Sequence, residues 1–533
     1  MKKIDSGLWM PWLLTVFLLA VICPPVLSQT ASRASSKEDL PTGYWSIEKS
    51  QPIIDKVQTI LLATDLSHLS AGERKAVDKL MEVGRIFQGL YEKQRHPEAV
   101  SSSTSVARLD KHGSTAATQN LLTLYRLFQG PIATTLENKR ESFLPVDDVQ
   151  PGKNVYPWGM RKEEVDAVPV NQRERVMGLR TVVRAGTQEN LAEDLATLKR
   201  YPALETLHPR LREDLSAVTP GEAGQLYAIP YSIAYADELM KSFALLNEGA
   251  DAVEQDDAEF ARYLRNRSRD LLSNDYESGD AAWVTGHFKN LNAQIGAYET
   301  YDDELFGVKT FFALSVLIRR QDETAALRTA MKGLQTLEDS LPYDHHKRVR
   351  EDIPVGVYDV IADFGQARGG NTATILPNES YLTRRYGRTI LLRANIMQDP
   401  AIYQSTSGVL TAAIGLDQAK ELTPDGNFYR TLWHEVGHYL GVDRTKDNRD
   451  LDEALLDNAS VMEELKADLV SLFVARTLAK QGYYSEAGLR SVYASGILRV
   501  LQNNKPRRDQ PYNTMQLMQW NFFLENGLLS FDR

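Results

Sequence analysis

Cysteine is almost absent from this chain of 533 residues. The single cysteine, Cys23, lies close to the N-terminus. The body of the protein therefore has no disulfide framework, no thiolate to bind a metal and no cysteine nucleophile. Any metal there must be held by histidine and carboxylate side chains. The chain has only nine histidines, so the candidate metal ligands are few.

Basic residues do not outnumber acidic ones. There are 61 Lys and Arg against 71 Asp and Glu, which gives a formal net charge of −10. An acidic chain without a basic stripe argues against nucleic acid as the main partner. No Gly-x-Ser-x-Gly motif is present, which disfavours a serine hydrolase. The composition is otherwise ordinary for a globular protein, and the length suggests two or three lobes.

The N-terminal residues have the pattern of a secretory signal peptide. Two lysines precede an apolar run over residues 13–23, two prolines interrupt it, and small residues precede a possible cleavage site before Gln29. We therefore assign residues 1–28 to a signal peptide and expect a periplasmic or secreted protein without further membrane segments. The alternatives are an uncleaved anchor and lipid attachment at Cys23.

The rest of the chain divides into three regions by composition. Residues 29–150 are mostly helical in pattern, and residues 151–235 are interrupted by proline and glycine. Residues 236–533 are again mainly helical, except that residues 354–396 favour strands. We expect a mainly α (α+β) fold, with a larger helical lobe and a smaller mixed or β lobe. No internal repeat is visible.

Local patterns within these regions give finer expectations. Hydrophobic periodicity predicts helices near residues 189–198 and 234–246, and helices that continue through residues 306–334. The Ser/Thr-rich residues 101–105 are expected to form a loop, and the Gly-Gly pair at 369–370 a turn.

The sequence His-Glu-Val-Gly-His at residues 434–438 is the strongest functional signal. On a helix, residues four apart lie on the same face, so both imidazoles can reach one ion. Glu435 lies beside that ion, where a carboxylate can take a proton from water. Asn427 can cap this helix and Gly441 can end it. By itself the pattern is also compatible with two unrelated histidines one turn apart.

A second helix offers a third ligand. Residues 460–463 have the pattern of a capping box, and the helix body that follows is nearly all apolar. Glu464 and Asp468 lie four apart on one face of it, where an unpaired buried carboxylate is costly. We expect Glu464 to bind the metal and Asp468 to accept a hydrogen bond from a ligand imidazole. Glu463 is the competing ligand, although capping the Ser460 amide is its expected role. The alternative is that Glu464 and Asp468 both face water.

These segments resemble the dipeptidyl-peptidase III family of zinc metallopeptidases, especially its shorter bacterial members. Residues 434–438 and 463–468 carry the resemblance, with further matches at residues 295–301 and 376–379. It runs from about residue 226 to residue 527. The resemblance implies two lobes around a wide cleft: one helical and zinc-binding, the other mixed with a small β-barrel. A peptide substrate would lie in the cleft as an extra strand.

The resemblance also assigns roles residue by residue. It implies that one zinc ion is bound by His434, His438 and Glu464, and that Glu435 is the general base. Tyr301 matches the tyrosine that stabilises the oxyanion. Residues 236–533 would form the peptidase-like region that contains this site. The sequence does not distinguish zinc from cobalt or manganese as the metal used in the cell.

The substrate-binding end departs from the family pattern. Glu299 and Asn378 match residues that hold the substrate's free amino terminus. Ile375, however, stands in place of an amine-binding Asn, Tyr512 in place of a His that polarises the scissile carbonyl, and Gln516 in place of an Arg. The two metal histidines are also one residue closer than is usual in the family. We therefore expect intact metal chemistry and a partly altered substrate site.

The expected function is zinc-dependent release of dipeptides from the N-terminus of short peptides. One alternative is a zinc hydrolase of the same fold with endopeptidase activity or another amide substrate. A second is a non-catalytic protein that binds a peptide or metal, which the presence of Glu435 disfavours, because metal binding does not need this residue. The sequence makes no prediction of oligomeric state.

Overall fold

The computed structural model describes residues 40–166, 168, 173, 176–221, 225–350, 353–368, 372–502 and 511–531. The expected signal segment 1–28 and the turn at 369–370 lie outside these residues. All elements described here belong to the unit that begins at Thr42. In the part of the chain that is described, no helix combines the length and the apolarity that a membrane crossing needs.

The first region consists of four helices: α1 (Ile47–Ile54), α2 (Ala71–Arg95), α3 (Ala99–His112) and α4 (Ala116–Phe128). The expected loop at 101–105 is wrong, because these residues lie inside α3. The hydroxyls of Ser101, Thr104 and Ser105 donate to backbone carbonyls three or four residues earlier. This satisfies them within the helix, so their usual competition with helical hydrogen bonds is absent.

Short elements follow α4, and the first two of them still lie within residues 29–150. They are β1 (Ile132–Thr134), β2 (Arg140–Ser142), η1 (Lys153–Val155), α5 (Lys162–Asp166), β3 (Thr181–Ala185), α7 (Gln188–Arg200), α8 (Pro202–Leu207), α9 (Leu211–Ser216), β4 (Leu226–Pro230) and α10 (Tyr231–Ala234). Three helices follow: α11 (Ala236–Val253), α12 (Ala258–Ser273) and α13 (Glu277–Thr285). The helices predicted near 189–198 and 234–246 correspond to α7 and α11.

A five-stranded sheet has the order β5-β6-β7-β9-β8. Its strands are β5 (Leu291–Ala297), β6 (Phe312–Arg319), β7 (Val355–Gly365), β8 (Ala373–Leu376) and β9 (Thr389–Arg393). Only β7 and β9 run parallel. Strands were correctly predicted at 354–396, whereas the helix expected across β6 is wrong. Seven of the eight β6 residues are buried, and a short apolar run buried on both faces cannot be told from a buried helix by periodicity.

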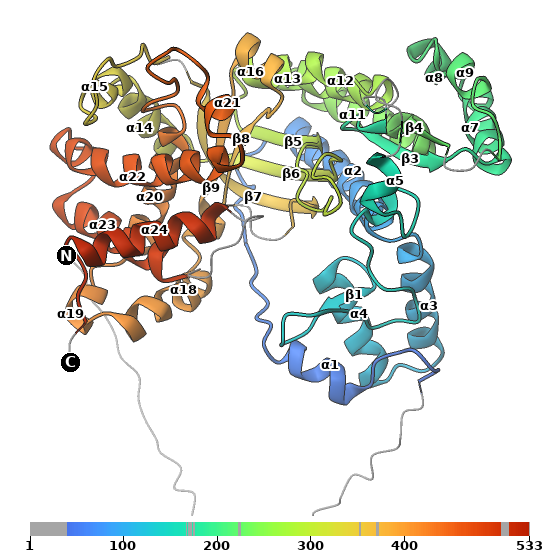
Figure 1. Cartoon of the computed structure of the whole chain (residues 1–533), viewed down its shortest axis with the longest axis horizontal. Helices are drawn as coiled ribbons and strands as arrows, with labels where there is room; N and C mark the ends of the chain where they lie inside the picture. Colours follow the sequence, from blue (N-terminus) through green and yellow to red (C-terminus); the bar gives the residue numbers. More distant parts are fainter. Residues whose placement is uncertain are drawn as a thin grey trace, which may run out of the picture. The chain divides into compact units, whose positions relative to one another are not determined.

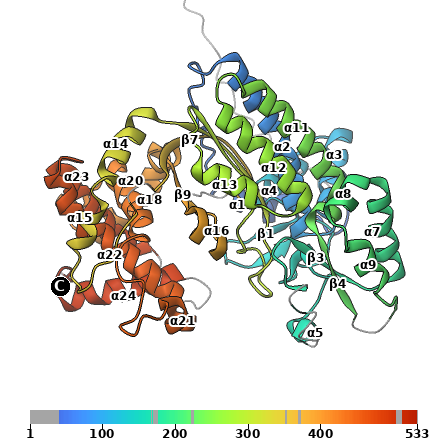
Figure 2. The same cartoon turned by 90° about the horizontal axis from the view of Figure 1, so that it is seen from above.

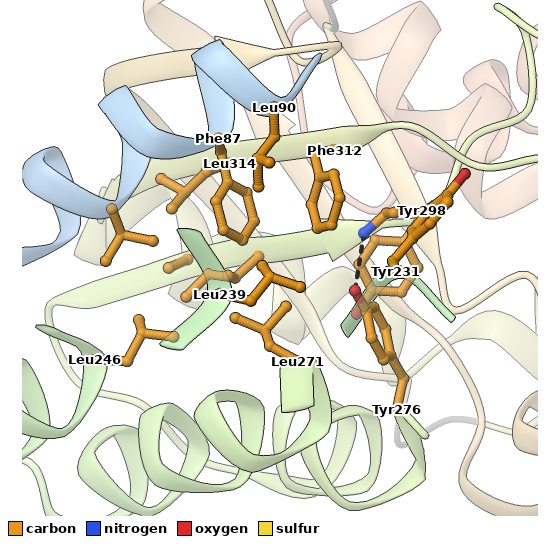
Figure 3. Close-up of a cluster of buried hydrophobic side chains, with 14 of the residues drawn as sticks. Phe87, Leu90, Tyr231, Leu239, Leu246, Leu271, Tyr276, Tyr298, Phe312 and Leu314 are labelled. Carbon is orange, nitrogen blue, oxygen red and sulfur yellow. Dashed lines mark hydrogen bonds between the residues drawn. The ribbon is translucent and has the colours of Figure 1, made fainter. Parts of the chain in front are cut away.

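The sheet lies between two hydrophobic cores. The first core includes buried residues of α2, α11, α12, β5 and β6, and Figure 3 shows side chains from it, among them Phe87, Leu239, Leu246, Phe312 and Leu314. The second core includes residues of α14, α20, α22 and α23. In β7, Val355 and Val357 belong to the second core, while Tyr358 and Val360 belong to the first. Since successive strand residues point to opposite faces, β7 separates the two cores.

The C-terminal half is helical around the second core, with the elements α14 (Gln321–Met331), α15 (Leu334–Asp339), α16 (Ser380–Tyr386), α17 (Ala394–Met397), α18 (Pro400–Ala413), α19 (Leu416–Ala419), α20 (Pro424–Gly437), α21 (Leu451–Leu455), η2 (Leu456–Asn458), α22 (Ala459–Lys480), α23 (Glu486–Gln502) and α24 (Pro511–Glu525). In both views α20 lies beside α22 (Figures 1 and 2), and it packs against α22 and α23. The predicted α+β class, mainly helical, is confirmed.

Candidate metal centre

Helix α20 contains His434, and His438 is its C-cap residue. Thr423 caps it, and its hydroxyl accepts a hydrogen bond from the Gly426 amide. The expected cap at Asn427 is wrong, because the helix starts three residues earlier at Pro424, whose fixed φ suits a first helical position. His438 follows the last helical residue but keeps helical dihedrals (φ −63°, ψ −25°). The four-residue spacing therefore still places the two imidazoles together, with ring centroids 5.0 Å apart.

Gly437 allows α20 to approach α22 closely. A Cβ atom at this position would lie 2.7 Å from the backbone oxygen of Ala467 and 3.0 Å from its Cα. Both are backbone atoms of α22 that cannot rotate away. The absence of a side chain thus offsets the low helix propensity of glycine and lets the histidine helix meet the helix that carries Glu464.

The three predicted ligands converge. Oε2 of Glu464 lies 3.1 Å from Nε2 of His434 and 3.9 Å from Nε2 of His438. One ligand atom from each residue lies within 4.8 Å of the others. Oε2 is buried and faces Nε2 of both histidines. Two imidazole nitrogens and a carboxylate oxygen that converge in this way are a donor set for a cation.

Both imidazoles are held at their other nitrogen by a carboxylate. Nδ1 of His434 lies 3.2 Å from Oδ1 of Asp468, as the sequence predicted, and Nδ1 of His438 lies 2.9 Å from Oε1 of Glu463. A proton on each Nδ1 leaves the Nε2 lone pairs free for a metal. Such carboxylate–histidine pairs are the usual support of a zinc site.

The expected capping role of Glu463 is wrong. Helix α22 starts at Ala459, one residue before Ser460, and its N-cap has no side-chain hydrogen bond. Glu463 instead contacts His438 and, at 2.8 Å, the ammonium of Lys466. Burial raises the pKa of Glu463, but the hydrogen bonds from His438 and Lys466 outweigh this and lower it to about 2.

Asp468 is the centre of a buried polar network. Its Oδ1 accepts from Nη1 of Arg430 at 2.6 Å and its Oδ2 from Nε2 of Gln519 at 2.9 Å. Burial raises the pKa of Asp468, yet Arg430 and His434 more than compensate and hold this pKa far below its ordinary value. The carboxylate is therefore charged and can orient His434. Sequence spacing pointed to Asp468, whereas no local signal pointed to Arg430 or Gln519.

The charge environment of His434 favours a cation. Burial lowers the pKa of His434, but its hydrogen bonds to Asp468 and Glu464 outweigh this and raise the pKa to about 9. Without a metal, the imidazole is thus protonated at neutral pH. Because a metal and a proton compete for the same nitrogen, metal binding must displace this proton.

Glu435 differs from the other site carboxylates because it is uncommitted. It is half-buried, and among the described residues it takes part in no hydrogen bond or ion pair. Its negative charge nevertheless contributes to raising the pKa of Tyr301 and Tyr512, which places it near both phenols. An uncommitted carboxylate next to the ligand set has the freedom that a general base needs.

Tyr301 lies on the loop after β5, and 75% of its surface is exposed. Loss of hydration and the charges of Glu299, Glu464 and Glu435 raise its pKa. Because most of the side chain is exposed to water, we attribute the raised pKa of Tyr301 to the neighbouring carboxylates more than to loss of hydration. The phenol is neutral at pH 7 and can donate a hydrogen bond.

Asp303 fixes the loop that carries Tyr301. Its two carboxylate oxygens accept from the backbone amides of four residues at 2.8–3.1 Å, which are Leu305, Phe306, Val308 and Lys309, and from the hydroxyl of Tyr156. Asp303 is 3% exposed. This tightly bound turn follows directly after Tyr301, and sequence reasoning missed it.

Glu299 and Asn378 lie together, as the resemblance implied. Nδ2 of Asn378 donates to Oε2 of Glu299 at 3.4 Å. Burial raises the pKa of Glu299, and hydrogen bonds from Tyr301 and Asn378 oppose the rise. The buried Arg180 joins the two chain segments, because its Nε donates to the Ala297 carbonyl and its Nη2 to Glu379. Arg180 is more than a hundred residues away in sequence, so no local signal could have indicated it.

The three residues that depart from the family pattern at the substrate-binding end lie in different surroundings. Tyr512 faces the metal ligands, since its hydroxyl donates to Oε1 of Glu464 at 3.2 Å. Ile375 of β8 packs against the second core. Gln516 is fully buried, and both of its amide atoms are without a partner among the described residues.

A cavity of about 1070 Å³ lies close to the centre but separate from it. Its walls are mostly apolar and include α22 residues on either side of Glu464, such as Met462 and Leu469. Neither histidine of the motif nor Glu464 lines it. Glu463, which supports His438, does line it, so the cavity reaches the carboxylate behind this imidazole.

Comparisons with known proteins agree with this geometry. Residues 389–507 match the family model of a zincin-like metallopeptidase. The chain is 26% identical over 394 residues to Nudix hydrolase 3 of Arabidopsis thaliana, which covers 72% of this chain and 48% of that protein. The chain thus spans about half the length of this relative.

Two solved bacterial structures share the fold. The match to dipeptidyl-peptidase III of Caldithrix abyssi has a TM-score of 0.71 at 22% identity. It covers 88% of this chain and 83% of the Caldithrix chain. The match to dipeptidyl-peptidase III of Corallococcus sp. strain EGB has a TM-score of 0.71 at 23% identity. It covers 92% of this chain and 85% of the Corallococcus chain. The resemblance predicted from the motifs is confirmed: the chain has the dipeptidyl-peptidase III fold, and the region that contains His434, His438 and Glu464 matches a zincin-like metallopeptidase.

Proposed function

We propose that this chain is a zinc-dependent peptide hydrolase that releases dipeptides from the free N-terminus of short peptides. One observation carries the proposal. Nε2 of His434, Nε2 of His438 and the buried Oε2 of Glu464 converge beside the uncommitted carboxylate of Glu435. The zincin-like match over the same residues and the dipeptidyl-peptidase III fold support it.

The ligand set suits zinc. Two imidazoles and one carboxylate are a common set in catalytic zinc sites, which keep a further position open for water or substrate. When bound, zinc would polarise a substrate carbonyl and lower the pKa of an attacking water to about 7. His434, His438 and Glu464 would hold it, while Asp468 and Glu463 keep the two imidazoles oriented.

The remaining chemistry belongs to two side chains. Glu435 takes a proton from the attacking water and passes it to the leaving amine, a role for which an unpaired carboxylate is suited. Tyr301 donates its hydroxyl proton as a hydrogen bond to the oxyanion of the tetrahedral intermediate. One such donor contributes roughly 3 kcal/mol to transition-state stabilisation.

The proposed exopeptidase specificity depends on the residues that would bind the free amino terminus of the substrate. Glu299 offers a carboxylate and Asn378 an amide oxygen to a substrate ammonium, and the two side chains already touch. The nearby strand β8 is an edge strand of the sheet, so an extended peptide can add to it by backbone hydrogen bonds. An endopeptidase of the same fold is the alternative, because Ile375 offers no polar group to the amine.

The test combines metal analysis with a panel of short peptides whose N-terminus is free or acetylated. We expect one zinc per chain and cleavage two residues from the free N-terminus only. Glu299→Gln should raise KM for free peptides about tenfold, because it removes a charge-assisted hydrogen bond, with kcat little changed.

Each other outcome of this panel contradicts part of the proposal. Equal cleavage of acetylated peptides would identify an endopeptidase. Stoichiometric zinc without turnover of any peptide would favour a binding protein on this scaffold.

We also propose that the protein is exported to a periplasm or secreted. The support is the signal-like pattern of residues 1–28. Cell fractionation and N-terminal sequencing of the mature protein test this. A protein retained with the cytosol and an intact N-terminus would contradict it.

A further inference from the structure

Tyr512 has a specific contact with one metal ligand. It lies in the first turn of α24, and its hydroxyl donates to Oε1 of Glu464 at 3.2 Å. The guanidinium of Arg499, on the neighbouring helix α23, lies 5.2 Å from the centre of its ring. The phenol is half-buried. Its contacts with Glu464 of α22 and Arg499 of α23 constrain its position.

The two oxygens of Glu464 are therefore not equivalent. Oε1 accepts the Tyr512 hydrogen bond, whereas Oε2 is buried and lies 3.1 Å from Nε2 of His434 and 3.9 Å from Nε2 of His438. We propose that Tyr512 is a positioning residue for the metal, which holds Glu464 so that only Oε2 is presented to the ion. This inference rests on the zinc site of the proposed function.

The hydrogen bond acts on Glu464 in two ways. It fixes the rotation of the carboxylate plane, and it withdraws electron density from Oε1, which makes that oxygen the poorer ligand. A carboxylate that binds through one oxygen occupies one coordination position, so a position stays open for water and substrate. Partners of this kind affect metal affinity by about 10- to 100-fold when they are removed.

The contact also limits what else Tyr512 can do. A phenol has one hydroxyl proton, and this proton is engaged with Glu464. It is then not available to polarise a scissile carbonyl, which is the role of the His that the resemblance aligns with this position.

The experiment compares Tyr512→Phe with Tyr439→Phe. Tyr439 follows His438 directly, but its hydroxyl donates to the Arg388 carbonyl at 3.3 Å and not to a ligand. Zinc affinity is measured by competition with a chromophoric chelator. The number of oxygen ligands is measured by X-ray absorption of the zinc-loaded proteins. Neither readout requires a peptide.

We expect Tyr512→Phe to weaken zinc binding about tenfold and to add a second oxygen from Glu464 to the coordination shell. Tyr439→Phe should match the wild type in both respects. Tyr512→His, which keeps a donor, should recover most of the affinity, and it replaces the phenylalanine variant if that variant fails to fold.

Zinc affinity and coordination of Tyr512→Phe equal to those of the wild type would overturn this inference and leave the proposed function intact. A wild-type chain that binds no zinc would overturn both. A loss of affinity as large in Tyr439→Phe would also overturn the inference, because the effect would then not be specific to the Glu464 contact.

Discussion

Nδ1 of His438 lies 2.9 Å from Oε1 of Glu463. This contact settles the orientation of the imidazole, because a proton on Nδ1 leaves Nε2 as the nitrogen that faces Glu464. It also explains why the successive residues Glu463 and Glu464 have different roles. Glu464 points to the space between the histidines, while Glu463 supports one of them from behind.

We predict that Glu435→Gln retains full zinc content and loses turnover by about 10³-fold, since general-base catalysis contributes on the order of 10²–10⁴-fold. Metal analysis and kcat on a free peptide measure the two effects separately. Glu486→Gln, at an exposed position of α23, serves as control and should match the wild type. A near-normal kcat in Glu435→Gln would exclude this residue as the base.

Asp468→Asn should weaken zinc binding about 10- to 100-fold, because His434 loses the carboxylate that orients it. The same change leaves the buried guanidinium of Arg430 without its charged partner, which costs about 3–5 kcal/mol of folding stability. Chelator competition and denaturant unfolding measure the two losses. Unchanged zinc affinity would show that Asp468 is structural only.

We predict that the metal-free protein loses stability as the pH rises from about 6.5 to about 9. The pKa of His434 is raised to about 9 in the folded chain from an ordinary 6.5, so its contribution is complete below 6.5 and absent above 9. Its upper limit is about 3 kcal/mol. Zinc affinity should rise over the same range, because less proton must be displaced.

Urea unfolding of the metal-free protein at several pH values measures this dependence. His434→Gln serves as the reference, since it removes the titrating group and leaves other ionisable residues in place. The difference between the two proteins should shrink as the pH increases. A difference that does not change between pH 6 and pH 9 would contradict the prediction.

Asp303→Asn should reduce kcat strongly with zinc content unchanged. Both carboxylate oxygens of Asp303 accept hydrogen bonds, whereas an asparagine has only one side-chain oxygen to accept them. Some backbone amides of the turn would therefore lose their acceptor, and Tyr301 would no longer be held in position. We expect a loss of stability of about 2–4 kcal/mol, from hydrogen bonds to a buried charge. Peptide kinetics and metal analysis of the folded fraction provide the check.

Asp194→Asn is the matched control for this change. Asp194 is also buried, at 2% exposed, and accepts from the Tyr227 hydroxyl at 2.6 Å, but it lies on α7, outside the candidate site. It should lower stability without changing kcat of the folded protein. Equal effects of both substitutions on kcat would show that Asp303 has no special relation to Tyr301.

Secondary structure followed from the sequence where the pattern was unambiguous. Long amphipathic helices such as α7 and α11 were predicted, as were the strands between residues 354 and 396. Strand β6 was not, because a residue run buried on both faces carries no periodicity. The predicted helix caps were also wrong at α20 and α22. Helix α20 starts earlier and is capped by Thr423, and α22 starts after Asn458, which makes no side-chain cap hydrogen bond.

The sequence by itself determined the pair of imidazoles at His434 and His438, because both lie on one helix and local geometry brings them together. The spacing of Glu464 and Asp468 in the second helix likewise indicated one ligand and one supporting carboxylate. Only the tertiary structure decided that Glu463 holds His438, that Arg430 balances Asp468 and that Tyr512 contacts Glu464. Each of these contacts joins α22 to a residue of another segment. That packing, which Gly437 permits between α20 and α22, is not encoded in any local pattern.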